Sequence, residues 1–316
     1  MRLFRSKGKK SDWACVNLHS DRVDVCHIRA AGRARPEIVT CDSYRKEEGD
    51  VATLRRLRRE LHLDRYRCMT LLRPGEYQIL QIDTPNVPRA EATSAARWRI
   101  KEMIDYPVES ATVDAVFIPG GAEARNGHML VVAAKTETVA AAIQPFNEAD
   151  IALEVIDIPE FAQRNLARWL ELPGRGLALL AFDERGGLLT FSSEGELYQS
   201  RRIEISQKSF GGDAESRKGV YDRLVLELQR SLDHFDRQFR QVTVARIMIT
   251  PVPGAEGLRE QLAATLDVPV ALLHLSEIMD FPHIPELHED ARQAQCVQLI
   301  GAALRELDVM AIPAAA

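Results

Sequence analysis

The stretch "WACVNLHSDRVDVCHI", Trp13 to Ile28, is predicted to form a β-hairpin near the start of the chain. Val16 and Leu18 precede a polar turn at residues 19–22, and Val23, Val25 and Ile28 follow it. A third strand is expected in "EIVTCDSY", residues 37–44, and a helix in residues 50–63, where leucines recur at helical spacing. Three strands followed by a helix open an α/β domain.

The composition bounds what the chain can be. It has 316 residues, so we expect two domains, and 46% hydrophobic with 28% charged residues favours a globular protein. The net charge of -5 argues against a partner that is nucleic acid, because phosphate neutralisation needs surplus Lys and Arg. The five cysteines show no CxxC pair, so neither zinc nor a disulfide framework is predicted.

The sequence contains no stretch long and apolar enough to cross a membrane. The basic start "MRLFRSKGKK" is not followed by the apolar segment of a signal peptide. We therefore expect a cytoplasmic protein without a transmembrane segment of its own.

Alternating strand and helix patterns continue through the first half. After a buried strand in "RCMTLL", the patterns predict strands in residues 75–85, 112–119, 127–135 and 152–159, and helices in residues 86–107 and 136–151. The block over 76–150 is predicted to be a small α+β insertion.

The second half repeats the order of the first. The patterns predict three short strands in residues 176–205, a long helix in 216–239, a strand in 244–250, a helix in 257–266, a strand in 268–275 and a closing helix in 289–307. The closing helix contains Gly301, Ala302 and Ala303, small residues that let another backbone approach. The repetition indicates duplicated α/β domains facing a cleft.

Several segments resemble the PilM family, the actin-like proteins of type IV pilus assembly, and most closely its MSHA-pilus members. The main segment is "QIDTPNVPRAEATSAARWRIKEMIDYPVESATVDAVFIP", residues 81–119. Others are "LEVIDIPEFAQRNLARW" at 153–169 and "LVLELQRSLDHFDRQF" at 224–239, with "GLREQLAATLDVPV" and "LIGAALREL" further on. These segments match the family in their order and in their local sequence, and together they span most of the chain.

The resemblance implies an α/β fold of the actin-like, duplicated ribonuclease H-like type, with two domains. Its first domain is expected over 1–75 and 151–172, an inserted α+β subdomain over 76–150, and a second domain over 173–316 that includes a smaller part at about 203–243. The family's place is the cytoplasmic side of the inner membrane, where it holds the N-terminal cytoplasmic peptide of a PilN-like membrane protein. A pilus assembly ATPase would be an indirect partner.

The resemblance also indicates three loops where nucleotide would bind. Where the superfamily places Asp-x-Gly in the first hairpin, this chain has Asn17 and His19, followed by Ser20. Asn17 lacks the charge that attracts magnesium, and His19 puts a ring where bare backbone is needed. Both also suit an ordinary turn.

The other two loops depart from the nucleotide-binding pattern as well. In the second, Asp183 precedes Gly186 and Gly187, whose glycines suit the tip of a hairpin. In the third, Pro251 replaces a glycine and removes an amide donor, while Gly254 survives nearby. We expect a degraded nucleotide site, no catalytic residue and no metal ligand, with ATP and magnesium as the alternative.

Two further groups of residues are candidates for binding. In the insertion, Trp98, Met103 and Tyr106 are candidates for partner contact, although Trp98 and Met103 would also suit a core. The segment "FPHIPELHED" contains two histidines among carboxylates, but its prolines favour a surface loop over a metal site.

The predicted function is a scaffold that binds the PilN-like peptide in a groove between the first domain and its insertion, placing it at the inner membrane through that partner. One alternative is a working ATPase of the same fold. Another is the cytoplasmic part of a type II secretion platform, against which the ending "VMAIPAAA" counts because it supplies no membrane helix.

Overall fold

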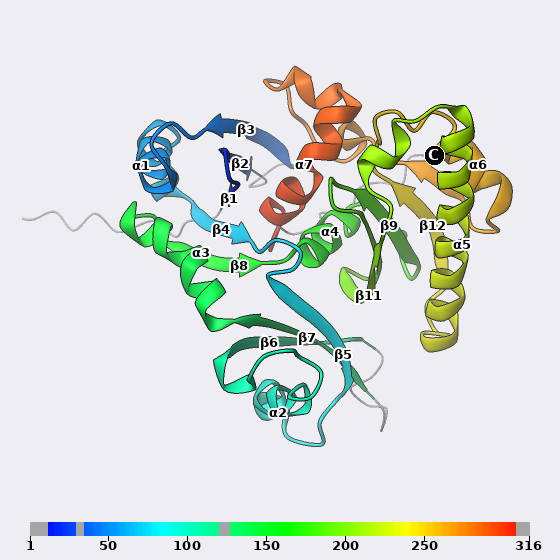
Figure 1. Ribbon diagram of the computed structural model, residues 1–316, viewed down its shortest axis with the longest axis horizontal. Helices are drawn as coiled ribbons and strands as arrows, with labels where there is room; N and C mark the ends of the chain where they lie inside the picture. The colour runs from blue at the N-terminus through cyan, green and yellow to red at the C-terminus, as the bar shows by residue number, and fades with distance from the viewer. Residues whose placement is uncertain (1–11, 30–34, 120–126, 308–316) are drawn as a thin grey trace, which may run out of the picture.

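The computed structural model describes residues 12–29, 35–119 and 127–307, so the basic start and the last residues of the chain lie outside it. Two five-stranded sheets stand side by side, and a three-stranded sheet lies below them in the view of Figure 1. No helix among the described residues combines the length and hydropathy needed to span a bilayer.

The first sheet has the strand order β3-β2-β1-β4-β8. The predicted hairpin is confirmed: β1 and β2 pair antiparallel, with Leu18 opposite Val23 at the turn. Its elements are β1 (Trp13–Leu18), β2 (Arg22–Arg29), β3 (Glu37–Arg45), β4 (Arg67–Leu71) and β8 (Leu153–Asp157), with α1 (Asp50–Glu60) and α3 (Thr136–Glu148) beside them. β4 and β8 run parallel to β1, as helical crossovers require.

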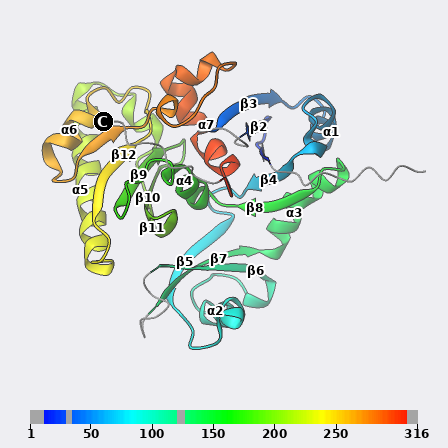
Figure 2. The same cartoon turned by 180° about the vertical axis from the view of Figure 1, so that it is seen from behind.

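The second sheet repeats this plan in the order β11-β10-β9-β12-β13. Figure 2 shows its hairpin strands together with the long helix α5. Along α5 an apolar stripe packs on the sheet, and the ring of Phe235 stacks on Phe191 with centroids 4.5 Å apart. The elements are β9 (Gly176–Phe182), β10 (Gly187–Ser193), β11 (Glu196–Ile203), β12 (Val244–Ile249), β13 (Val270–Leu272), α5 (Ala214–Gln238) and α6 (Leu258–Thr265).

The insertion is an antiparallel sheet of order β5-β7-β6 covered by one helix. The elements are β5 (Tyr77–Asp83), β6 (Ala111–Phe117), β7 (His128–Lys135) and α2 (Ala92–Arg99). The helix expected over 86–107 is shorter than predicted, because the chain turns after Arg99 and puts Ile100 and Ile104 into the insertion's own core. The predicted domain boundaries stay predictions.

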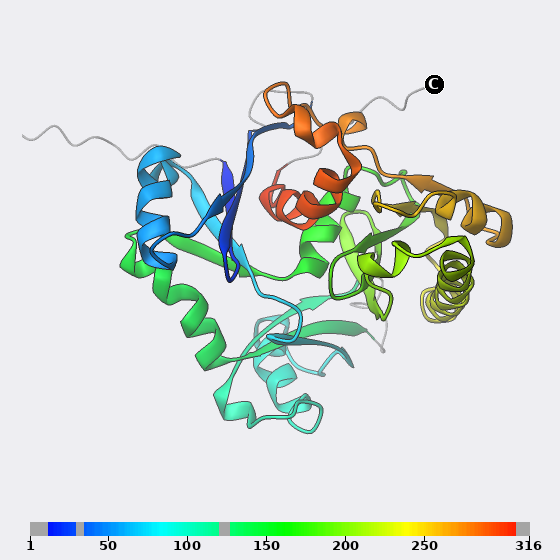
Figure 3. The same cartoon turned by 45° about the horizontal axis from the view of Figure 1, so that its top comes forward.

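Two helices lie between the large sheets, α4 (Pro159–Ala167) and α7 (Asp290–Ala303), as Figure 3 shows. A Cβ atom on Gly301 would lie 2.1 Å from the carbonyl oxygen of Ala162, so the two helices touch backbone to backbone. This confirms the expected role of the small residues in the closing helix.

Short 3-10 turns lie between these helices and strands. They are η1 (Leu63–Arg65), η2 (Arg89–Glu91), η3 (Val108–Ser110), η4 (Gln207–Phe210), η5 (Leu275–Glu277) and η6 (Pro285–His288).

Candidate functional site

The first hairpin uses its polar side chains within the first sheet. The side-chain oxygen of Asn17 accepts a hydrogen bond from the backbone N–H of Leu71 at 2.9 Å and lies 3.4 Å from the hydroxyl of Thr70. Asn17 therefore ties the end of β1 to the end of β4, where the hydrogen-bonded ladder would otherwise stop.

The turn of this hairpin is closed by charges of its own. Nε2 of His19 lies 2.9 Å from a carboxylate oxygen of Asp24, and the ammonium of Lys46 donates to the carbonyl of His19. Burial favours the neutral form of Asp24, but hydrogen bonds from His19 and Ser43 outweigh it and lower the pKa of that carboxyl. Ser20 is exposed at the tip of the turn.

The second hairpin is closed in the same way. The carboxylate of Asp183 accepts hydrogen bonds from the backbone N–H groups of Arg185 and Gly186, at 2.7 and 2.9 Å. A Cβ atom on Gly186 would lie 2.6 Å from the carbonyl oxygen of Ile203, so glycine is required here by close packing. Gly187 begins β10 against the ring of Phe182, which confirms its place in the hairpin.

A polar cluster, which we call the clamp, joins the two halves beside this hairpin. Arg202 of β11 forms an ion pair of 3.2 Å with Glu160 of α4, a residue only 2% exposed. The hydroxyl of Tyr77 donates to the same carboxylate at 2.5 Å, and Arg185 donates to the carbonyl of Pro74 at 2.7 Å. Burial, and then the charge of Glu160, raise the pKa of Tyr77.

The third loop lines a cavity of about 360 Å³. The backbone at Gly254 has φ of 80°, and a Cβ atom there would lie 3.3 Å from the carbonyl oxygen of Phe210 in η4. The lining includes three carboxylates and one guanidinium, from Glu256, Glu260, Asp290 and Arg259. The negative charge of the cavity therefore disfavours phosphate.

At the first two loops, the polar groups that a magnesium nucleotide would meet are engaged within the protein. Asn17 and Asp183 accept hydrogen bonds from their own backbone surroundings, and His19 is paired with Asp24. A phosphate at these two loops would have to displace those contacts.

An open groove lies on the other side of the first half, between the insertion and the first sheet. It has a volume of about 330 Å³, and its apolar floor includes Leu130, Ile158 and Phe161. Consecutive residues of two strands form its walls, 114–116 of β6 and 154–157 of β8. In Figure 1 these strands and β7 border the space between the insertion and the first sheet.

Both wall strands are the outer strands of their sheets. An outer strand presents N–H and C=O groups that no neighbouring strand pairs, and an extended peptide can add to such an edge. The groove therefore offers main-chain pairing together with an apolar floor.

Charged residues stand at one end of the groove. Arg305 donates to the buried carboxylate of Asp157 at 2.6 Å, and the guanidinium of Arg164 lies over the ring of Phe161 at 5.2 Å. Burial lowers the pKa of Arg164, although Glu196 at 3.8 Å opposes that shift. A bound polar group at this end would meet guanidinium groups already held in place.

The three partner candidates in the insertion do not line this groove. Trp98 is 61% exposed and Met103 47% exposed, so the interpretation of these two as core residues is wrong. Tyr106 is half-buried against the core of the insertion, with Lys135 over its ring at 5.8 Å. Met103 lines a separate cavity beside α5.

The segment "FPHIPELHED" is the one in which the sequence offers a choice between a metal site and a surface loop. Its histidines lie in the turns before α7, where His288 packs its ring against Phe281. Within the ranges that the structure describes, no group of three or more His, Cys, Asp or Glu side chains is arranged to hold a metal ion.

Sequence reasoning missed the clamp and the groove walls. The clamp joins residues 77, 160 and 202, which no local motif connects, so only the repeated strand order could have hinted that they meet. The walls depend on which strands end their sheets, a property of the assembled fold.

Comparisons with known proteins agree with this geometry. No family model matches the chain, and no curated protein matches it in sequence. Among solved structures, the PilM-PilN type IV pilus biogenesis complex matches with a TM-score of 0.74 and 20% identity, over 95% of this chain and 100% of that one.

Two other matches are weaker. A Bacteroides thetaiotaomicron protein with an actin-like ATPase fold has a TM-score of 0.49 at 10% identity, covering 95% of this chain and 98% of that one. The cytoplasmic domain of EpsL, from the type II secretion system of Vibrio cholerae, has a TM-score of 0.49 at 12% identity. The match covers 92% of this chain and 95% of that one. The chain has the actin-like fold, with two sheets of five strands and a small antiparallel insertion, and its architecture is similar to that of PilM.

Proposed function

We propose that this protein is a PilM-like scaffold of a type IV pilus assembly platform, of the MSHA type and therefore MshI-like. In this proposal it binds the N-terminal cytoplasmic peptide of a PilN-like inner-membrane protein and lies at the cytoplasmic face of that membrane through its partner. A pilus assembly ATPase would be reached indirectly. The observation that carries the proposal is the groove with two unpaired strand edges, in a fold similar to PilM.

Capture in this groove would combine two kinds of contact. An extended peptide adds its backbone to the edge of β6 or β8, and alternate side chains enter the apolar floor at Leu130 and Phe161. Arg164 and Arg305 can donate to a carbonyl of the peptide, whereas the carboxylates of Asp114, Glu154 and Asp157 in the same lining disfavour an acidic side chain there. The partner is thus read by a few side chains.

Nucleotide binding has no part in this mechanism. The carboxylate and amide groups at the first two loops are engaged within the protein, as described above. Losing several such interactions, each of about 1 to 3 kcal/mol, would take a micromolar affinity to a negligible one.

The test is a groove variant with a matched control on the same face of the same strand. Val116→Glu places a carboxylate in the groove, whereas Thr112→Glu places one on β6 beside Thr136, outside it. A synthetic N-terminal peptide of the PilN-like subunit is titrated by calorimetry against the wild type and against each variant. We expect Val116→Glu to weaken binding about tenfold or more and Thr112→Glu to leave it within about twofold. Equal binding by all three proteins would refute the groove as the site.

One observation favours the second candidate, an ATP-binding protein of the same fold. The hydroxyl of Thr250 is buried, lines the cavity of the third loop and has no hydrogen-bond partner among the described residues. A ribose or base could supply that partner. Titration of the wild type with ATP and magnesium distinguishes this candidate, because the scaffold requires no binding.

A further inference from the structure

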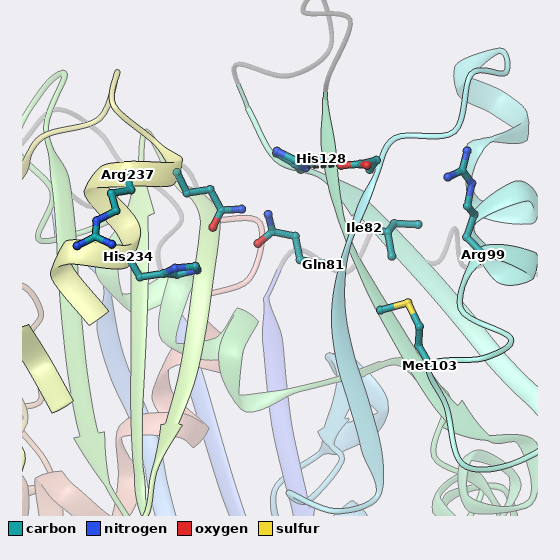
Figure 4. Close-up of a pocket in the computed structure, with 9 residues that line it drawn as sticks. Gln81, Ile82, Arg99, Met103, His128, His234 and Arg237 are labelled. Atoms are coloured by element: carbon teal, nitrogen blue, oxygen red, sulfur yellow. Dashed lines mark ion pairs between the residues drawn. The ribbon is translucent and has the colours of Figure 1, made fainter. Parts of the chain in front are cut away.

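A further cavity lies outside both the nucleotide loops and the peptide groove. It has a volume of about 660 Å³ and opens between the insertion and the C-terminal end of α5, more than a hundred residues further along the chain. Figure 4 shows Gln81 of the strand β5 on the side of α5, where His234 and Arg237 lie, and Ile82 on the other side of β5, near Met103. It shares no lining residue with the peptide groove.

The lining is rich in basic groups on both walls. Arg99 and His128 come from the insertion, and His234 and Arg237 come from α5. The one carboxylate among the lining residues, Asp83, lies 3.2 Å from Nδ1 of His128 and is therefore already paired. The two guanidinium groups face no lining carboxylate that would neutralise them, so the cavity attracts anionic groups.

Exposed apolar side chains accompany these charges. Met103 lines the cavity at 47% exposure, and Trp98, at 61%, directly precedes Arg99 at the end of α2. Val87, in the same insertion, is 39% exposed. Exposed Trp and Met beside Arg is the composition of a protein-binding surface, since these residues are enriched where partners are held most tightly.

We infer that this cavity is a docking site for an acidic polypeptide segment of a partner protein. Carboxylates of the segment pair with Arg99 and Arg237, and an apolar side chain packs on Met103 and Ile82. The side-chain amides of Gln81 and Gln238 are available to the segment's backbone. The inference does not depend on the peptide groove, so either proposal can fail alone.

The shape of the site favours a polypeptide over an anionic membrane. The lining residues stand on two walls, α5 and the insertion, and Figure 4 shows β5 between Met103 and α5, so an extended chain along the edge of β5 reaches residues of both. A chain of amino acids passes between the walls and contacts charges on each. Because one wall is the insertion and the other is α5, an occupant would also bridge the two parts of the molecule.

The experiment uses a fluorescein-labelled peptide of about 12 residues with the repeat Glu-Leu-Glu-Glu, and a second with Lys in place of Glu. Fluorescence anisotropy is recorded for the wild type and for the double variant Arg99→Glu/Arg237→Glu. The matched control is Arg65→Glu/Arg175→Glu, which changes the net charge equally at two exposed arginines outside the cavity. Circular dichroism checks that both variants fold, and Arg99→Gln/Arg237→Gln repeats the test without charge reversal.

We expect the acidic peptide to bind the wild type, the cavity variant to bind it about tenfold more weakly or worse, and the control to stay within about threefold. The Lys peptide should not bind. An equal loss in both variants, or binding to vesicles of anionic phospholipid without binding of the acidic peptide, would overturn the inference. An excess of the PilN-like peptide should leave the anisotropy unchanged, and full displacement would contradict a separate site.

Discussion

The contact between the two halves differs from the contact between the insertion and the rest of the molecule. The halves meet through α4 and α7, backbone against backbone at Gly301, and through the clamp of Arg202, Glu160 and Tyr77. The insertion, in contrast, is bordered by two cavities of about 330 and 660 Å³. The contact between the halves is filled by the protein's own atoms. The contact of the insertion is filled only in part, because Tyr77 of β5 belongs to the clamp and Leu130 of β7 packs in the main core, while the two cavities are left open.

This difference indicates where binding partners act. In a filled interface every added group must first displace a packed side chain or a satisfied hydrogen bond. In an open one, unpaired strand edges and guanidinium groups remain available. We therefore expect substitutions between the halves to change stability, and substitutions beside the insertion to change binding.

The largest effect on stability is expected from Gly301→Ala. The new methyl group would lie 2.1 Å from the carbonyl oxygen of Ala162, a distance that forces α7 away from α4. We expect a loss of about 3 kcal/mol or more in the free energy of unfolding. Chemical denaturation measures it.

The matched control is Gly219→Ala, in the second turn of α5, where no atom lies within 4 Å of the added methyl group. This change should raise stability by up to about 1 kcal/mol, because alanine favours the helix. Equal effects of the two substitutions would mean that the halves are not closely packed at Gly301.

A smaller loss should follow from breaking the clamp with Arg202→Met. The carboxylate of Glu160, 2% exposed, then lacks its cation and keeps only the hydroxyl of Tyr77. We expect the free energy of unfolding to fall by about 2 kcal/mol, measured by thermal or urea unfolding. This loss is smaller than for a fully buried pair because Arg202 is itself partly exposed. Adding Glu160→Gln to this variant should restore part of the loss.

The neighbouring residue provides the comparison. Arg201 pairs with Glu227 on the surface at 2.7 Å. Arg201→Met should cost less than about 1 kcal/mol, as surface ion pairs do. If both arginine variants lost the same amount, the clamp would be no stronger than a surface pair.

The first hairpin should show a smaller effect than the clamp, and one that depends on pH. Hydrogen bonds from His19 and Ser43 lower the pKa of Asp24 below the ordinary 3.8, so its charged form is favoured by folding. Asp24→Asn should cost about 1 to 2 kcal/mol at pH 7. Because the wild type loses this stability as pH falls through the folded pKa, the difference between the two proteins should shrink below pH 3.8.

Urea unfolding at several pH values measures this difference. A difference that stayed constant down to pH 3 would show that Asp24 does not hold the turn through its charge.

Much of the fold could be predicted from the sequence, because strand alternation and helical spacing are local. The hairpin at Trp13–Ile28, the long helix and the repeated order of the halves all follow from such patterns. The end of α2 could not be predicted in this way. The helix ends there because Ile100 and Ile104 are buried in the core of the insertion, which depends on tertiary packing.

The candidate site was less predictable. The family resemblance indicated which loops to inspect, and Asn17, His19 and Asp183 do lie at the two hairpins. The exposure of Trp98 and Met103 could not be derived, because apolar residues at helical spacing usually indicate a core. The clamp and the groove join residues far apart in sequence, so their geometry required the structure.

One measurement distinguishes most directly between partner capture beside the insertion and nucleotide binding between the halves. The purified protein is titrated by calorimetry with the N-terminal peptide of the PilN-like subunit, with and without ATP and magnesium, and with ATP and magnesium alone. We expect the peptide to bind with an affinity that ATP changes by less than about twofold, and ATP alone to give no binding heat. Tight binding of ATP without binding of the peptide would contradict the scaffold function.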